Sequence, residues 1–138
     1  MPGYLRLSPI VPARQVSHRA RSTKLQKTAV AALEDIKARN ITVLDVRRLT
    51  SLYDTMIIAT AESSRQVKAL SQHVRDALKA GGASIIGIEG EQTGEWVLVD
   101  AGELVVHIMQ PATRTYYNLE ELWTPHAPRR QSKAAAPA

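Results

Sequence analysis

The chain has 138 residues, a length that suits one domain with a hydrophobic core, and it contains no cysteine. The lack of cysteine excludes disulfide frameworks, thiolate zinc sites and cysteine nucleophiles, and it fits a reducing compartment. No apolar run reaches the roughly 18 residues that a membrane-spanning helix requires, so we expect no membrane partner.

Charge is distributed unevenly along the chain, whose formal net charge is +5. Residues 34–123 contain all thirteen acidic residues but nine of the eighteen basic ones, so this segment carries −4 and the two ends together carry +9. Within it, residues 89–123 contain seven acidic residues against one basic residue, Arg114. A basic protein often binds nucleic acid, but here the basic residues are concentrated at the ends. The acidic side of the domain instead favours a basic partner.

The two ends of the chain lack the periodicity of folded elements. Residues 1–22 contain three prolines, four arginines and no acidic residue, so we expect a basic, disordered extension. This composition also resembles an organelle transit peptide, but we favour an extended or mis-assigned start and a cytoplasmic location in a bacterium. Residues 124–138 are predicted to form a Pro/Ala-rich basic tail, because they contain no core-forming residues.

Between the ends, the sequence predicts helices and strands in alternation. Ser22 or Thr23 can cap a first helix, Ser63 or Ser64 can cap a second, and a Gly-Gly pair at residues 81–82 ends the second. The helices carry apolar residues at helical spacing, and the strands are short apolar runs. The predicted elements are, in chain order, a helix over residues 23–39, strands over 41–46 and 53–61, a helix over 63–79, strands over 84–88, 96–100 and 103–110, and a helix over 113–122.

The order of these elements, α-β-β-α-β-β-β-α, predicts an α/β (α+β) fold in which helices pack on a mixed sheet of about five strands. The β-α-β step should cross over with a right-handed turn. We therefore expect a basic extension over residues 1–22, a folded domain over residues 23–123 and a basic tail over residues 124–138.

The predicted hairpin over residues 96–110 has two different faces. If Ala101 and Gly102 are the two loop residues, Asp100 lies opposite Glu103, and one face of the hairpin is entirely aliphatic, as expected for the core side. The other face mixes aromatic, aliphatic, histidine, methionine and carboxylate side chains. Its members are Trp96, Leu98, Asp100, Glu103, Val105, His107 and Met109.

This second face has two interpretations. Aromatic, methionine and aliphatic groups rimmed by charge are typical of a protein-docking surface. An arriving Lys or Arg would also relieve the repulsion between the two facing carboxylates. Alternatively, a helix of the same domain covers the face, and Trp96 belongs to the core. Alternation along the strands fits both interpretations.

Few residues suggest catalysis. The four histidines have none of the spacings typical of a metal site, and no Gly-rich phosphate loop opens a helix. Ser63 and Ser64 are first of all candidates for a helix cap. Together with Glu89 and Glu91 they could also belong to a nucleotidyl-transfer site, which needs two or three carboxylates around Mg²⁺. We predict no cofactor, no metal and no enzymatic activity, and nucleotide binding or transfer stays the alternative.

The spacing of residues in the last third of the chain resembles that of a known family. The motif is Glu95-Trp96-x3-Asp100-x-Gly102-Glu103-x3-His107-x-Met109, followed by Arg114, Tyr117, Leu119-Glu120 and Leu122-Trp123. It closely resembles the Iojap/RsfS family of ribosomal silencing factors, and the similarity extends upstream to cover about residues 23–123. The family more often has Asp at positions 95 and 103 and Gly at position 61, where this chain has Glu, Glu and Ala.

The resemblance implies a non-enzymatic translation repressor. It would bind a basic protein of the large ribosomal subunit, ribosomal protein fourteen, and sterically block joining of the small and large subunits under nutrient limitation or in stationary phase. It also implies a nucleotidyltransferase-like scaffold without the catalytic carboxylate set, and a homodimer when free. We expect the basic ends to add weak contacts with ribosomal RNA.

The resemblance and the two-faced hairpin together predict the partner-binding residues. The aromatic and aliphatic members, with Met109, would make apolar contacts, and the carboxylates would pair with basic groups of the partner. His107 and Tyr117 would support or join the surface, whereas Trp123 is expected to be structural. The predicted partner-binding residues are Glu89, Trp96, Leu98, Asp100, Glu103, His107, Met109 and Tyr117.

Overall fold

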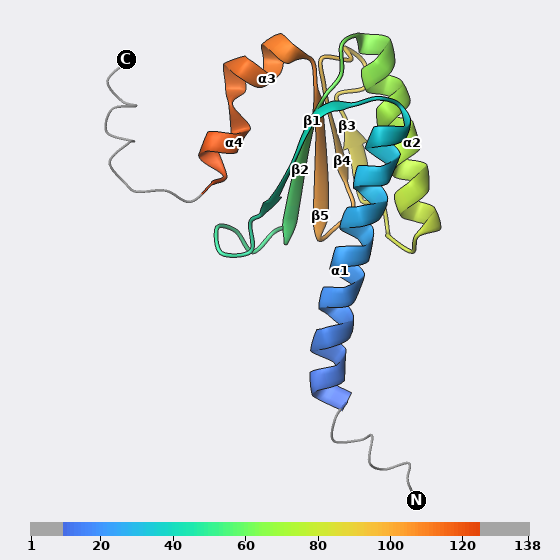
Figure 1. The fold of residues 1–138 in the computed structure, drawn as a ribbon, viewed down its shortest axis with the longest axis vertical. Helices are drawn as coiled ribbons and strands as arrows, with labels where there is room; N and C mark the ends of the chain where they lie inside the picture. The colour runs from blue at the N-terminus through green and yellow to red at the C-terminus, as the bar shows by residue number, and fades with distance from the viewer. Residues whose placement is uncertain (1–9, 125–138) are drawn as a thin grey trace, which may run out of the picture.

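The computed structural model describes residues 10–124, with the side chains of residues 21–124, and its centre is a five-stranded sheet (Figure 1). The strands lie in the order β1-β2-β5-β4-β3, and neighbours are antiparallel except for the parallel pair β2 and β5. The predicted mixed sheet with packed helices is confirmed. The strands are β1 (Arg39–Asp45), β2 (Thr55–Thr60), β3 (Gly87–Glu89), β4 (Trp96–Asp100) and β5 (Leu104–Met109).

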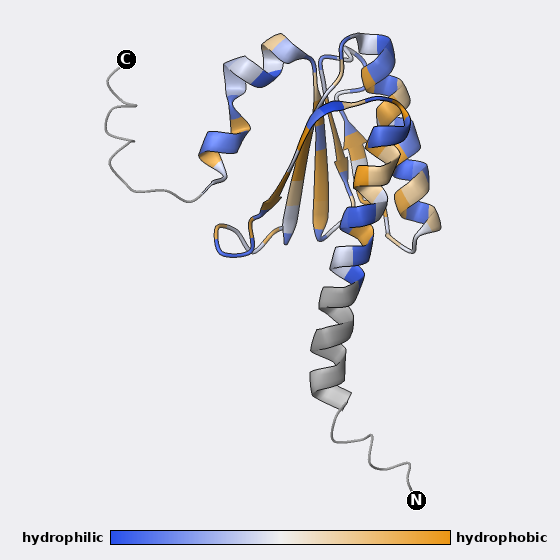
Figure 2. Ribbon diagram, viewed as in Figure 1, coloured by the Kyte–Doolittle hydropathy of each residue, from blue (hydrophilic) through white to orange (hydrophobic). Residues whose placement is uncertain are grey.

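The main core lies on one face of the sheet, here called the inner face, which is covered by α1 (Ile10–Asp35) and α2 (Ser64–Ala80). Both helices lie on the same side of the sheet (Figure 1). The strands are mostly hydrophobic, whereas α2 alternates between hydrophobic and hydrophilic residues (Figure 2). Leu33 of α1, Leu70 of α2 and Val106 of β5 have no exposed surface. Burial of one such side chain stabilises the fold by about 1.5–3 kcal/mol.

The opposite, outer face of the sheet carries a second, smaller apolar cluster. The central strands β2 and β5 are buried along their whole length, so they need cover on both faces. Two short helices, α3 (Pro111–Tyr117) and α4 (Leu119–Leu122), lie on this side of the sheet (Figure 1). The buried members of the outer cluster are Val46, Met56, Ile58, Val105, Met109 and Leu119.

The second helix begins and ends as predicted. Ser63 is its N-cap, and the Ser63 hydroxyl accepts a hydrogen bond of 3.1 Å from the Gln66 amide. The amide of Gly81 closes the other end by donating to the Ala77 carbonyl at 3.0 Å. Val67, Leu70, Val74 and Leu78 form the buried stripe that the helical spacing predicts. Within residues 10–124, no helix is both long and apolar enough to cross a membrane.

The first helix differs from its prediction at both ends. It begins at Ile10, so residues 10–22, which we expected to be disordered, are helical. Pro12 does not prevent this, because proline is tolerated in the first turn of a helix. The helix ends at Asp35 because Lys37 adopts a left-handed conformation with φ = 62°, and the chain enters β1 at Arg39. Residues 1–9 and 125–138 of the predicted ends lie outside the described residues.

The predicted single helix over residues 113–122 is wrong, because the chain forms two shorter helices there. Asn118, with φ = 48°, separates α3 from α4. Asparagine tolerates this left-handed conformation better than most residues, so it can end one helix and redirect the chain. Pro111 is the first residue of α3, where its fixed φ suits a helix start. Strand β3 is also shorter than the predicted 84–88.

The β4–β5 hairpin has the predicted faces but not the predicted pairing. Asp100 lies opposite Val105 instead of Glu103, and Trp96 lies opposite Met109. The connection runs over residues 101–103 and is closed by a 2.8 Å hydrogen bond from the Ala101 amide to the Leu104 carbonyl. Side chains on a strand alternate with a period of two, so a register shift of two residues leaves each strand residue on its predicted face.

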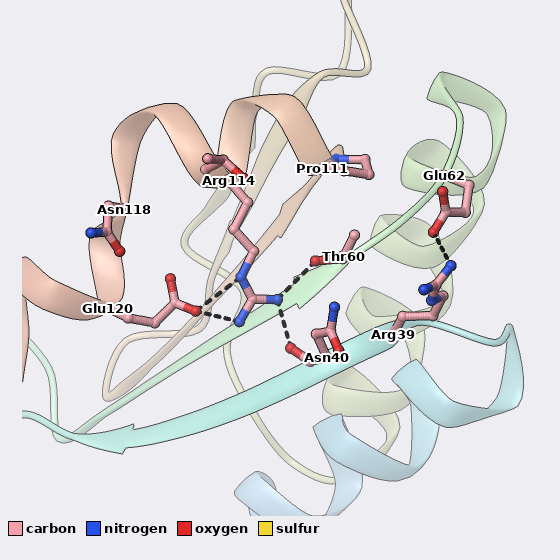
Figure 3. A pocket seen from close by; sticks show the side chains of 9 residues that line it. Arg39, Asn40, Thr60, Glu62, Pro111, Arg114, Asn118 and Glu120 are labelled. Carbon is pink, nitrogen blue, oxygen red and sulfur yellow. Dashed lines mark hydrogen bonds and ion pairs between the residues drawn. The ribbon is translucent and has the colours of Figure 1, made fainter.

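One arginine holds α3 and α4 against the outer face. The side chain of Arg114 is 12% exposed, and its Nε and Nη2 donate to the Glu120 carboxylate at 3.0 and 2.5 Å. Its Nη1 donates to the Asn40 carbonyl at 2.6 Å and the Thr60 hydroxyl at 2.8 Å (Figure 3). Its Nη2 also donates to the Thr42 hydroxyl at 2.9 Å. The guanidinium thus joins the C-terminal helices to β1 and β2.

Replacement of this arginine should destabilise the domain. Arg114→Met leaves the Glu120 carboxylate without its donor, so we expect the free energy of unfolding to fall by about 2–3 kcal/mol. The matched control is Arg47→Met, because the Arg47–Asp45 pair lies in solvent and should contribute almost nothing. Urea denaturation measures both changes, and equal effects would show that the Arg114 network does not stabilise the fold.

The turn between β3 and β4 requires glycine at position 90. Gly90 has φ = 92°, and a Cβ atom added there would lie 2.1 Å from the carbonyl oxygen of Trp96. Backbone atoms cannot rotate away as a side chain can, so this contact would displace the first residue of β4. The absence of a side chain at Gly90 therefore allows β3 and β4 to approach each other.

We expect Gly90→Ala to lower the free energy of unfolding by about 2 kcal/mol or more, through backbone strain and the close contact. Gly87→Ala, on the adjacent strand β3, is the matched control, because a Cβ atom added there would meet nothing within 4 Å and the φ of Gly87 is not in the left-handed region. Thermal unfolding of the two variants checks the difference, and a Gly90→Ala protein as stable as Gly87→Ala would contradict it.

Candidate protein-docking surface

The two short helices cover only part of the outer face. Leu119 of α4 is buried in the outer cluster, and Arg114 fixes α3 to the β1–β2 side of the sheet. Burial along β4 alternates between half-buried outer residues and fully buried inner residues. The outer residues of β4 are Trp96, Leu98 and Asp100, so this strand leaves side chains partly accessible on the outer face.

We define the docking surface as these three β4 residues with the neighbouring residues that contact them or extend their surface. Glu89 on β3 lies opposite Leu98 in the register and is exposed. Tyr53, from the loop before β2, reaches Asp100 with its hydroxyl. Two tyrosines at the end of α3 complete the surface. Its members are Glu89, Trp96, Leu98, Asp100, Tyr53, Tyr116 and Tyr117.

Aromatic rings form the centre of this surface. The ring centroids of Trp96 and Tyr117 lie 4.8 Å apart with a tilt of 47°, and those of Tyr117 and Tyr116 lie 4.9 Å apart at 85°. Such offset and edge-on pairs contribute about 0.5–1.5 kcal/mol beyond the burial of their area. Tyr116 and Tyr117 are still 80% and 52% exposed. A large aromatic area is therefore available to a partner.

Two predicted contact residues lie beneath the surface. Met109 has no exposed area and His107 is 6% exposed, so neither can meet a partner directly in this conformation. Met109 is not available here for the apolar contact that we predict, because β5 is a central strand covered on both faces. Trp96 donates from Nε1 to Nδ1 of His107 at 2.9 Å. Burial lowers the pKa of His107 to about 4, so the imidazole is neutral at physiological pH.

Asp100 has contacts both within the turn and on the surface. Its carboxylate accepts hydrogen bonds from the Gly102 amide at 3.0 Å and from the Tyr53 hydroxyl at 3.3 Å. Burial raises the pKa of Tyr53, and the negative charge of Asp100 raises it further, so the phenol keeps its proton. The half-buried carboxylate of Asp100 is thus held at one end of the aromatic surface.

Glu103, by contrast, is bound by the protein's own first helix. Its carboxylate forms an ion pair with Arg21 at 2.5 Å and accepts a hydrogen bond from the Ser22 hydroxyl at 3.0 Å. The predicted pairing of Asp100 with Glu103 across the strands does not occur, because Asp100 lies opposite Val105. The arginine that we expected from a partner is present in α1. Glu103 therefore anchors α1 and does not belong to the docking surface in this structure.

Several other carboxylates near β3 and β4 carry charge that the domain does not neutralise. Glu89 and Glu95 are exposed and Glu91 is partly exposed. Within residues 21–124, none of the three forms an ion pair. Arg114, the single basic residue among residues 89–123, is already bonded to Glu120. This side of the molecule is therefore negative, as the sequence indicates.

Among the described residues, the side chains that the sequence offers for nucleotidyl transfer are used in the fold or are not arranged in a metal-binding group. The Ser63 hydroxyl is used as the helix cap, and a Cβ atom on Gly94 would lie 2.6 Å from the Cβ of Ser64, so another loop packs closely there. Among the described residues, no group of three or more His, Asp or Glu side chains is arranged to hold a metal ion. Glu89 lies on the edge strand β3.

One pocket of the described residues has no β4 residue in its lining. Its volume is about 690 Å³, and its lining includes Arg39, Glu62, Arg114 and Glu120 (Figure 3). All five N–H groups of a guanidinium can donate, and those of Arg114 are used by the five hydrogen bonds to protein oxygens. Arg39 is paired with Glu62 at 2.6 Å. The pocket thus has few polar groups free for a ligand.

Sequence reasoning misses three residues of this region. It places Tyr53 at the start of a strand, does not single out Tyr116 beside Tyr117, and notes Arg114 chiefly for its charge. A tyrosine beside a predicted strand end and a tyrosine pair in a short helix are signals that could have included the first two. The role of Arg114 cannot be read locally, because its acceptors lie up to 74 positions away in the chain.

Known proteins share this sequence and fold. The family described as "Ribosomal silencing factor during starvation" matches residues 19–137. A Chromobacterium violaceum protein named Ribosomal silencing factor RsfS is 52% identical over 114 residues, which cover 83% of this chain and 93% of that protein. A mouse protein named Mitochondrial assembly of ribosomal large subunit protein 1 is 34% identical over 98 residues, or 69% of this chain and 43% of that protein.

The similarity holds in three dimensions as well. A crystal structure of a Chromobacterium violaceum protein superposes on this chain with a TM-score of 0.73 at 53% identity, covering 77% of this chain and 88% of that one. The family match includes the hairpin and the motif residues from which the family is expected. The chain therefore belongs to the RsfS/Iojap family of ribosomal silencing factors.

Proposed function

We propose that this protein represses translation by binding the large ribosomal subunit through the docking surface and thereby preventing the small subunit from joining. The observation that carries the proposal is an exposed aromatic surface beside carboxylates that the described residues leave without ion pairs. Membership of the silencing-factor family supports it, and the name of the mouse relative supports the choice of the large subunit. The family resemblance suggests ribosomal protein fourteen as the partner.

The apolar part of the surface suits tight binding. Tryptophan and tyrosine are the residues that most often dominate the energy of protein interfaces. Trp96 is held by a hydrogen bond and by ring packing against Tyr117, so it has little conformational freedom to lose on binding. The half-buried Leu98 adds aliphatic area beside it.

The charged part of the surface suits a basic partner. Residues 89–123 have a net charge of −6, from seven acidic residues and one arginine. Complementary charge mainly accelerates association and excludes partners of the same sign. Ribosomal proteins need basic side chains because they contact RNA phosphates, so an acidic docking surface distinguishes such a protein from the surrounding RNA.

Steric obstruction needs no catalytic group. A domain of roughly 100 residues has a radius of gyration of about 13 Å. Such a body, bound on the face of one subunit, holds the other subunit away from it. The proposed mechanism therefore requires only that the docking surface be occupied by a large-subunit protein on the side where the two subunits meet.

Sedimentation with separated subunits tests this function. We expect the protein to migrate with large subunits, to be absent from the small-subunit fractions and to reduce re-association of the two. Truncation of one anchor, Leu98→Ala, should weaken binding about tenfold, since it removes apolar contact area at the centre of the surface.

The matched control for this truncation is Ile86→Ala. Ile86 is 68% exposed, precedes β3 and is not one of the residues of the docking surface. Its truncation should leave sedimentation unchanged. Binding to small subunits, or normal subunit joining with the protein bound, would overturn the proposed function, and equal losses for both variants would move the docking site elsewhere.

Charge reversal at the rim should act on the association rate. Glu89→Lys places a cation beside the aromatic surface, so we expect association with large subunits to slow by about tenfold at low ionic strength, and less in high salt. Asp76→Lys makes the same change in net charge on α2, which covers the inner face, and should have a smaller effect. Stopped-flow measurement over a salt series compares them. Identical rates for the two variants would show that only net charge matters.

A further inference from the structure

The indole N–H of Trp96 has a single acceptor among the described residues. An indole nitrogen donates and cannot accept, so its 2.9 Å contact with Nδ1 of His107 requires that Nδ1 carry a lone pair. Burial, which lowers the pKa of His107 to about 4, keeps the ring neutral. The proton of the neutral ring must then be on Nε2. The contact therefore identifies the indole as the donor and the form protonated on Nε2 as the tautomer of His107.

The location of His107 suits it to act on Trp96. His107 lies opposite Leu98 on the adjacent strand, and its ring centroid is 5.8 Å from that of Trp96. It is 6% exposed, in a central strand whose neighbours fix it from both sides. Trp96 is half-buried and lies on a strand nearer the sheet edge, beside Tyr117 of a seven-residue helix. The better-fixed partner of the pair is thus the imidazole.

We propose that His107 is a positioning residue of the docking surface: its neutral imidazole accepts the indole N–H of Trp96 and so holds the tryptophan ring at the orientation in which the partner meets it. This inference rests on the proposed function and adds to it the residue that pre-organises its main aromatic contact. His107 itself stays below the surface. Its effect on binding passes entirely through the orientation of Trp96.

The structure explains why a buried polar group is kept at this position. An aliphatic residue at position 107 would leave the indole N–H without an acceptor unless the ring turned toward water, which would separate it from Tyr117. A rigid ring loses less conformational entropy when a partner binds than a ring that samples several rotamers. A hydrogen bond within the free protein therefore contributes to affinity although it makes no contact with the partner.

Two substitutions separate this role from simple packing. His107→Leu removes the acceptor, whereas His107→Asn keeps an oxygen near the position of Nδ1. We expect His107→Leu to weaken binding to large subunits by about tenfold and His107→Asn by less than about threefold, in line with the net contribution of one hydrogen bond. His73→Leu is the control histidine, because His73 is on α2 and pairs with Asp35 at 3.0 Å.

Nuclear magnetic resonance detects the hydrogen bond between Trp96 and His107 without a binding measurement. In the native protein, we expect the imidazole ¹⁵N spectrum of His107 to show an unprotonated Nδ1 and a protonated Nε2, and the indole proton of Trp96 to exchange slowly with water. The indole signal should move in His107→Leu and stay in place in His107→Asn and His73→Leu. The native spectrum alone tests the tautomer if His107→Leu does not fold.

The outcomes of these experiments distinguish the positioning role of His107 from the proposed function. A protonated Nδ1 in the native protein would overturn the positioning role whatever the binding data show. A bond that is present but whose loss leaves binding unchanged would overturn it as well. Failure of the native protein itself to bind large subunits, with the hydrogen bond present, would instead reject the proposed function, and the positioning role would fall with it. Weaker binding of His107→Leu with rescue by His107→Asn supports the inference.

Discussion

The sheet is apolar on both faces, but the two long helices can cover only one of them. Strands β2 and β5 are buried along their whole length, so the outer face needs cover as well. That cover comes from helices of seven and four residues, which are too short to be stable alone. The hydrogen bonds of Arg114 to β1, β2 and Glu120 hold these helices in place. The arrangement of the whole outer face depends on this arginine.

The incomplete cover creates the docking surface. The short helices protect the β1–β2 side and leave the outer side chains of β4 half-buried. Exposed apolar area costs solubility, and proteins keep it mainly where a partner covers it. Here the exposed rings are arranged by internal contacts: Trp96 bonds to His107 and packs on Tyr117. Nearby carboxylates make the edge of this surface negative, which suits the basic partner that we propose. The part of the sheet that the helices leave partly uncovered therefore coincides with the proposed site of action.

Much of the architecture follows from local patterns. The Ser63 cap, the stripe of α2 and the alternation of β4 each predict their element, because capping and periodicity act within a few residues. The element ends were less predictable. Lys37 and Asn118 adopt left-handed conformations that end α1 and split the last helix, and no rule of spacing marks them. The hairpin register was wrong by two residues, yet the faces were right because the side-chain period is two.

The sequence alone was sufficient to predict the family and the mixed sheet. It also predicted that the hairpin has one aliphatic face and one mixed face, since motif spacing and alternation are properties of the chain itself. Tertiary structure decided which members of the mixed face are available. Met109 is buried because β5 is central, and Glu103 is bound by Arg21 of α1. Tyr53 joins the surface through Asp100, 47 positions away. These outcomes depend on contacts between distant segments, which local periodicity does not encode, so only the packed fold distinguishes a docking residue from a structural one.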